Sequence, residues 1–120
     1  GITMPITEKT VSETLRRMGM PVSGKGFNYI KTAVLMLNDD DNYINAMVHR
    51  LYPEIAKQYG EENHLRVGRA IRHSIERTFE VGDESEINRI LLNIPKKSGM
   101  PTNSDFLAGV YEYLKYAEAV

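Results

Sequence analysis

Residues 51–79 have the sequence LYPEIAKQYGEENHLRVGRAIRHSIERTF, and the spacing of their apolar and turn-forming residues decides the fold. Pro53 suits the first turn of a short helix, where its missing N–H group is not needed. Gly60 predicts the end of that helix, and Asn63 is a residue type that caps a following one. The segment therefore predicts a short helix, a tight turn and a longer helix over residues 64–80, which is the order of a helix-turn-helix.

The predicted long helix has two different faces, because successive residues advance by about 100° around a helix axis. One face is expected to pack on the core and carries Val67, Ala70, Ile71, Ser74, Ile75 and Thr78. The opposite face carries Arg66, Arg69, Arg72, His73 and Glu76. Residues 63–79 have a net charge of +3 and the whole chain has −1, so the remainder carries −4. The basic charge is therefore concentrated in one exposed stripe.

The arginine stripe has three interpretations at this point. A planar guanidinium pairs bidentately with guanine or with phosphate, so the stripe is suited to reading DNA. The same stripe is suited to docking an acidic protein partner, such as an RNA polymerase subunit. Arginines on a solvated helix face also serve solubility alone, and a short helix, a glycine turn and a long helix occur in proteins that bind no DNA.

The rest of the chain predicts an all-α domain. Apolar residues recur at helical spacing nearly throughout, and no alternating pattern indicates a strand. We expect about six helices in a single domain spanning residues 1–120. Beyond the two helices above, the predicted elements are a helix capped by Thr7 and ended by Gly19, a helix over 27–38, a helix over 42–52, a helix after the turn at 82–85, and a last helix capped by Thr102 or Ser104.

The composition limits the function classes. The chain has 120 residues and no cysteine, which excludes disulfides, thiol nucleophiles and thiolate metal sites. It has no apolar run near the length of about 20 residues that a membrane span needs, and no signal-peptide pattern. We therefore expect a cytoplasmic protein with no membrane contact and no cofactor. Nothing in the sequence indicates an enzyme.

Three small clusters have both a ligand-binding and a structural interpretation. The aspartates at 39–41 are expected to stop one helix and cap the next rather than bind magnesium. Residues 23–26 are rich in glycine but lack the spacing of a phosphate-binding loop. Zinc needs three or four ligands in close geometry, and we expect none from the three histidines, His49, His64 and His73.

Four segments resemble one known family, the effector domains of the sporulation stage-zero response regulators of endospore-forming bacteria. They are LYPEIAK at 51–57, RVGRAIRH at 66–73, PTNSDF at 101–106, and Lys-Gly-Phe at 25–27 followed by Tyr-Ile at 29–30. The likeness covers nearly the whole chain, from about Ile6 to Leu114, in order and with similar spacing.

The resemblance implies a six-helix domain whose helix-turn-helix reads a short box in double-stranded DNA. Family members are driven by an N-terminal receiver of a two-component system, and phosphorylation favours homodimers on tandem boxes that activate or repress transcription. A receiver alternates strands and helices, a pattern that this segment lacks. Either the segment is an effector domain separated from its receiver, or the natural protein lacks a receiver, and we expect the first.

The resemblance also assigns candidate residues. The base-reading candidates on the recognition helix are Arg66, Arg69, Arg72 and the adjoining His73. The resemblance further assigns Lys25, in the loop before the second helix, to the DNA phosphate. Two further phosphate candidates, Asn63 before the recognition helix and Lys97 in the last loop, rest on their places in the sequence and not on the resemblance. Lys97 is open to a second interpretation as part of a solvated loop. The last helix offers Tyr113 or Tyr116 as an exposed contact between protomers.

Gly68 departs from the family pattern, which has glutamate within Arg-Val-Glu-Arg. Glutamate can accept a hydrogen bond from cytosine and can orient neighbouring arginines, whereas glycine does neither. Glycine also weakens a helix by about 1 kcal/mol relative to alanine. The identity of the DNA box, the target genes and the direction of regulation are therefore not predicted by the sequence.

Overall fold

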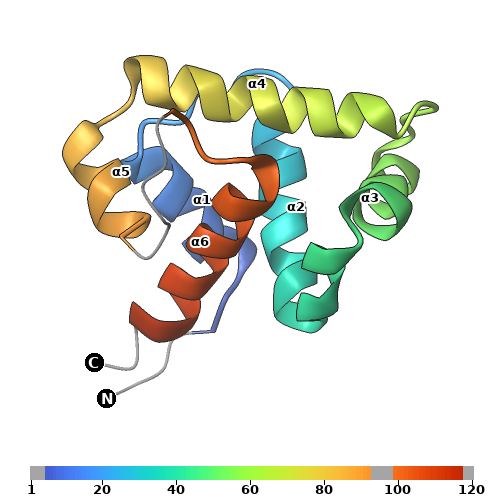
Figure 1. The fold of residues 1–120 in the computed structure, drawn as a ribbon, viewed down its shortest axis with the longest axis horizontal. Coiled ribbons are helices and arrows are strands. Elements are labelled where there is room, and N and C mark those ends of the chain that lie inside the picture. The colour runs from blue at the N-terminus through green and yellow to red at the C-terminus, as the bar shows by residue number, and fades with distance from the viewer. Residues whose placement is uncertain (1–4, 93–98, 118–120) are drawn as a thin grey trace.

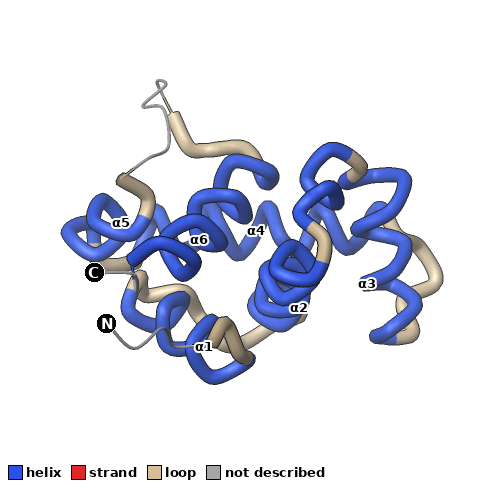
Figure 2. The backbone as a smooth tube through the Cα atoms, turned by 90° about the horizontal axis from the view of Figure 1, so that it is seen from below, coloured by secondary structure: helices blue, strands red, loops and turns tan. Residues whose placement is uncertain are grey.

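The computed structural model describes residues 5–92 and 99–117, and these form helices and loops without a strand, as Figure 2 shows. The expected all-α fold is confirmed. The six α-helices are α1 (Glu8–Arg17), α2 (Gly26–Asp39), α3 (Tyr52–Tyr59), α4 (Leu65–Val81), α5 (Glu84–Ile90) and α6 (Asn103–Ala117). Two short helical turns, η1 (Asp41–Asn45) and η2 (Met47–Leu51), connect α2 to α3.

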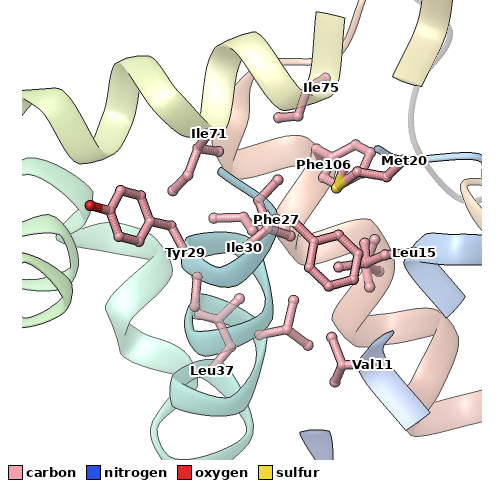
Figure 3. Packing of buried hydrophobic residues seen from close by; sticks show 14 of the residues in the cluster. Val11, Leu15, Met20, Phe27, Tyr29, Ile30, Leu37, Ile71, Ile75 and Phe106 are labelled. Carbon is pink, nitrogen blue, oxygen red and sulfur yellow. The ribbon is translucent and has the colours of Figure 1, made fainter. Parts of the chain in front are cut away.

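Helix α2 is the central element, and α1, α4 and α6 pack around it (Figure 1). Its residues Ile30, Ala33 and Val34 are completely buried. Figure 3 shows Ile71 and Ile75 reaching from α4 toward the same core. Because each helix contributes an apolar stripe to one shared cluster, the burial of these stripes holds the domain together.

Most helix ends follow the signals in the sequence. Thr7 forms a capping box with Thr10, in which each side chain accepts from the other residue's backbone N–H. The Asp83 side chain accepts from the backbone N–H of Glu86 at the start of α5. Of the two caps predicted for the last helix, the structure uses Thr102, whose hydroxyl accepts from the N–H of Asp105.

The single helix predicted over 42–52 is wrong in detail. Residues 41–45 form a 3₁₀ helix and residues 47–51 form a π-helical turn, with a break at Ala46. The π-turn continues directly into α3, so that the short helix starts at Tyr52 rather than at Glu54. The apolar spacing in this segment does not distinguish the helix types, because each of the two elements has only five residues, little more than one turn of any of them.

Close backbone approach fixes α3 and α4 relative to α2. The ring of Tyr59, at the end of α3, lies edge-on against Tyr29 of α2, with centroids 5.2 Å apart. Gly26, the first residue of α2, touches α4 so closely that a Cβ there would collide with the Ser74 side chain and the Ala70 carbonyl. Gly60 then turns the chain between α3 and α4 with a φ of 69°, which glycine adopts without strain.

Candidate nucleic-acid interface

Helix α4 runs across one side of the domain (Figure 1), and its inward face is as the periodicity predicts. The inward face is confirmed, because all its members are buried except the half-buried Ala70: Val67, Ile71, Ser74, Ile75 and Thr78. The hydroxyl of Thr78 donates to the Ser74 carbonyl one turn earlier, so the buried polar group is satisfied. The outward face of α4 is left free to meet a partner.

The predicted arginine stripe is exposed only in part. Arg66, Arg69 and His73 are exposed, as expected. Arg72 is half-buried, and its guanidinium donates a 2.6 Å hydrogen bond to the carbonyl oxygen of Pro101. The expectation that Arg72 stands free on the outer face is therefore corrected. Its planar head is used to fix the chain just before α6.

Glu61 connects two of the predicted DNA contacts. Its carboxylate lies 3.5 Å from the Lys25 ammonium and 3.6 Å from the Arg66 guanidinium. The cations are well exposed, at 71% and 66%, whereas the glutamate side chain is only 7% exposed. A hydrogen bond from the backbone N–H of Asn63, together with the two cations, lowers the pKa of Glu61. The carboxylate is therefore charged at neutral pH and offsets part of the positive surface.

Asn63 helps to start α4. Its side-chain oxygen accepts a 3.0 Å hydrogen bond from the backbone N–H of Leu65, the first residue of the helix. The bond satisfies one of the unpaired N–H groups of the helix end. The N-cap position itself is His64, which makes no side-chain cap bond, so Asn63 acts one position earlier than predicted. Asn63 lies beside the Lys25–Glu61–Arg66 cluster. Lys97 lies outside the residues that the structure describes.

Gly68 is explained by packing against Tyr52. A Cβ on Gly68 would lie 2.8 Å from Cε2 of the Tyr52 ring, which is closer than real Cβ contacts. The amide nitrogen of Asn103 donates to the Gly68 carbonyl at 3.0 Å and to the Tyr52 hydroxyl oxygen at 3.1 Å. Burial raises the pKa of Tyr52. The glycine therefore allows α3, α4 and the start of α6 to meet at one point.

Three residues of this surface, Glu61, Tyr52 and Asn103, are not predicted by sequence reasoning. The signal for the last two was present in Gly68, since a glycine inside a helix often indicates close approach of another group. The signal for Glu61 was weaker, because an acidic residue in a turn is usually solvated. Of the two tyrosines proposed for a protomer contact, Tyr113 is half-buried and accepts a hydrogen bond from Arg89, whereas Tyr116 is exposed.

A small helical domain whose short helix and glycine turn lead into a long helix with a basic outer face has the layout of a helix-turn-helix DNA-binding domain. Residues 11–114 match the family model described as "Sporulation initiation factor Spo0A C terminal". The chain belongs to this family. It is therefore a DNA-binding effector domain of the sporulation-regulator type, a class that acts in transcription regulation.

Two further observations concern other kinds of site. Within residues 5–92 and 99–117, no helix has the length and apolar character needed to cross a membrane. Over the same described ranges, no three histidine or acidic side chains gather in a way that could hold a metal ion.

Proposed function

We propose that the domain binds double-stranded DNA in a sequence-specific manner with α4 in the major groove and α3 bracing it, residues 51–79 forming the helix-turn-helix. The main support for this proposal is that α4 has one face buried against the core and one outward face that is basic. A major groove admits one α-helix, whose exposed side chains then reach the base edges. Arg66, Arg69, Arg72 and His73 are the proposed base-reading residues.

The three arginines have different surroundings, and we therefore expect them to contribute differently to the recognition of a DNA sequence. Arg69 lies at the centre of the outer face and is exposed, so its guanidinium is available for a bidentate contact with guanine. Arg66 shares the Glu61 carboxylate with Lys25 and must leave that ion pair to reach a base. Arg72 has to keep or exchange its bond with Pro101. We therefore expect Arg69 to contribute the largest part of the discrimination between sequences.

Phosphate contacts are proposed at the edge of α4 that faces α2. Lys25 is exposed there, and its ammonium group pairs with Glu61, which lies in the turn before the first residue of the helix. Asn63 lies at the same place, and Lys97 is a further proposed phosphate contact. Contacts of this kind give affinity and salt dependence but no sequence information.

Fluorescence anisotropy against two duplexes tests the proposal. One duplex carries the tandem box of the family, and the other carries a scrambled sequence, both at physiological salt. A clear preference for the box supports sequence-specific binding and shows that Gly68 is tolerated. Equal submicromolar binding to both contradicts recognition of that box, and selection from random duplexes would then identify the site. Binding to neither contradicts the proposal.

Two variants separate base reading from phosphate binding. Arg69→Ala should weaken binding to the preferred duplex by about tenfold or more and reduce discrimination. Arg16→Ala on α1, which also removes an exposed arginine, should leave discrimination unchanged. Lys25→Ala should weaken all duplexes alike and flatten the dependence of affinity on salt concentration. A loss of affinity confined to one sequence would contradict the role of Lys25.

The competing function is a protein-interaction module that uses the basic face of α4 to dock an acidic partner such as RNA polymerase. It predicts that the domain has no measurable affinity for duplex DNA.

Homodimers on tandem boxes belong to the first proposal, in which the domain binds DNA. They predict that the domain binds two adjacent boxes cooperatively, with a steeper binding curve than it shows on a single box.

A further inference from the structure

Leu65 is an apolar residue on the otherwise basic face of α4. It is the first residue of the helix and is 47% exposed. It lies one turn before Arg69 and two turns before Arg72, so the three side chains follow one stripe. In a helix-turn-helix, the first residues of the second helix are those that meet base edges. A leucine at that position offers no hydrogen bond to a base.

An open groove of about 500 Å³ lies beside Leu65. The ring of Tyr52 and the backbone of Gly68 contribute to its lining, and Thr102 and Asn103 contribute from the start of α6. The absence of a side chain at Gly68 lets the Tyr52 ring pack directly on α4, so that the ring forms part of the wall of the groove. The groove therefore combines exposed apolar surface with the base-reading stripe.

Arg69 and Arg72 also contribute to the lining of the groove. Two cations next to apolar surface suit a ligand that carries an apolar group beside negative charge. Duplex DNA has that combination at one place in its major groove, where the C5-methyl group of thymine lies between the phosphate strands. The methyl group is the only apolar group that a base presents there, and apolar side chains contact it.

We infer that Leu65 and the groove beside Gly68 receive the methyl group of one thymine, which makes Leu65 a specificity-determining residue. The inference rests on the proposed function, because it requires α4 to lie in the major groove. Leu65 and Arg69 are about 6 Å apart along the helix axis, and base pairs are about 3.4 Å apart. The thymine is therefore expected within about two base pairs of the base that Arg69 contacts, whatever the angle between α4 and the groove.

Thymine-to-uracil substitution tests the inference, because it removes the methyl group and leaves every hydrogen-bonding group in place. Each thymine of the preferred duplex, identified by random-sequence selection, is replaced in turn, and the affinity is measured by anisotropy. We expect one position to lose about fourfold in affinity, which corresponds to one buried methyl group. Other positions should change little.

Leu65→Ala identifies the side chain that is responsible. In this variant, replacement of the sensitive thymine by uracil should no longer reduce the affinity. The affinity should still respond to changes of the base pair that Arg69 contacts. Val48→Ala is the matched control, since Val48 is equally exposed at 47% and does not line the groove. The control should retain the full sensitivity to uracil. Circular dichroism and thermal unfolding check that both variants fold, as their exposure leads us to expect.

The possible failures are distinguishable. If the unaltered domain binds duplex DNA but no thymine is sensitive, or if Leu65→Ala keeps the same sensitivity, the inference is wrong and the proposed function stands. If the unaltered domain binds no duplex, the proposed function and the inference fail together.

Discussion

The two long edges of α4 are held in different ways. The edge toward α2 carries the Lys25–Glu61–Arg66 cluster, in which well-exposed cations share one carboxylate. The edge toward α6 carries the Tyr52–Gly68–Asn103 cluster, in which a ring packs on the backbone and an amide donates two hydrogen bonds. Exposed ion pairs contribute little to stability, whereas buried hydrogen bonds are expensive to lose. The edge toward α2 therefore determines the charge of the surface at the start of α4, and the edge toward α6 fixes the position of α4.

Removal of the Asn103 amide should have the largest effect on stability. Asn103→Ala removes the extra donor of the Gly68 carbonyl, which as an internal carbonyl of α4 also accepts along the helix, and it removes the hydrogen bond to the Tyr52 hydroxyl. We expect the free energy of unfolding to fall by about 1–3 kcal/mol, measured by urea denaturation. Asn88→Ala, on the exposed side of α5, is the control and should stay within about 0.5 kcal/mol. Equal effects of the two substitutions would mean that the α6 edge does not fix α4.

A second variant tests the contact between Gly68 and the tyrosine ring. Alanine stabilises a helix by about 1 kcal/mol relative to glycine, but in this place its Cβ meets the Tyr52 ring at 2.8 Å. We expect Gly68→Ala to destabilise the domain by about 1 kcal/mol, because overpacking outweighs helix preference. In a Tyr52→Ala background the same change should become stabilising. The absence of this reversal in a double-mutant cycle would contradict the packing explanation.

The sequence predicts features that lie within one helix better than it predicts contacts between helices. Repeating patterns within one helix are reliable, since the burial of Val67, Ile71 and Ile75 depends only on helical period and an apolar core. Helix caps such as Thr7 and Asp83 are also local signals. The two faces of α4 and the domain's helical class could therefore be predicted.

The contacts on the α6 edge could not be predicted, because they join residues far apart in the sequence. Arg72 bonds to Pro101 across 29 positions, and Asn103 bonds to Gly68 across 35. No periodic pattern connects such pairs, and from the sequence Gly68 is interpreted as a lost glutamate and a weakened helix position, not as a contact with another helix. The choice among 3₁₀, π and α geometry in 41–51 was also inaccessible, because elements of little more than one turn are too short for their apolar spacing to distinguish the three.

The α2 edge should show its effect in DNA binding rather than in stability. Glu61→Gln removes the negative charge beside Lys25 and Arg66. We expect affinity for scrambled duplex to rise about threefold at low salt, and the gain to shrink as salt screens the charges. Glu62→Gln removes the same charge from the exposed neighbouring residue, and it is expected to give a smaller gain. Equal gains would show that total charge matters and the cluster does not.

The smallest expected effect is the pH dependence that Glu61 contributes to stability. The folded-state pKa of Glu61 lies below its ordinary value of 4.5. Its stabilising contribution is therefore present above about pH 4.5 and is lost as the pH falls through the folded-state pKa. The stability difference between the unaltered domain and Glu61→Gln should narrow in that range. Urea denaturation at pH 7 and at pH 3 measures it, and a difference that grows in acid would contradict the assignment.

The contact at Gly26 makes the basic loop and the long helix one rigid unit. Because the backbone of α2 at Gly26 lies directly against the Ser74 side chain and the Ala70 carbonyl of α4, the two helices cannot shift relative to each other by small steps. The distance from Lys25 to the outer face of α4 is then changed only through the flexible stem of the lysine. A duplex that meets both must match this fixed spacing, so any remaining misfit has to be absorbed by bending the DNA, whose bending energy depends on its sequence.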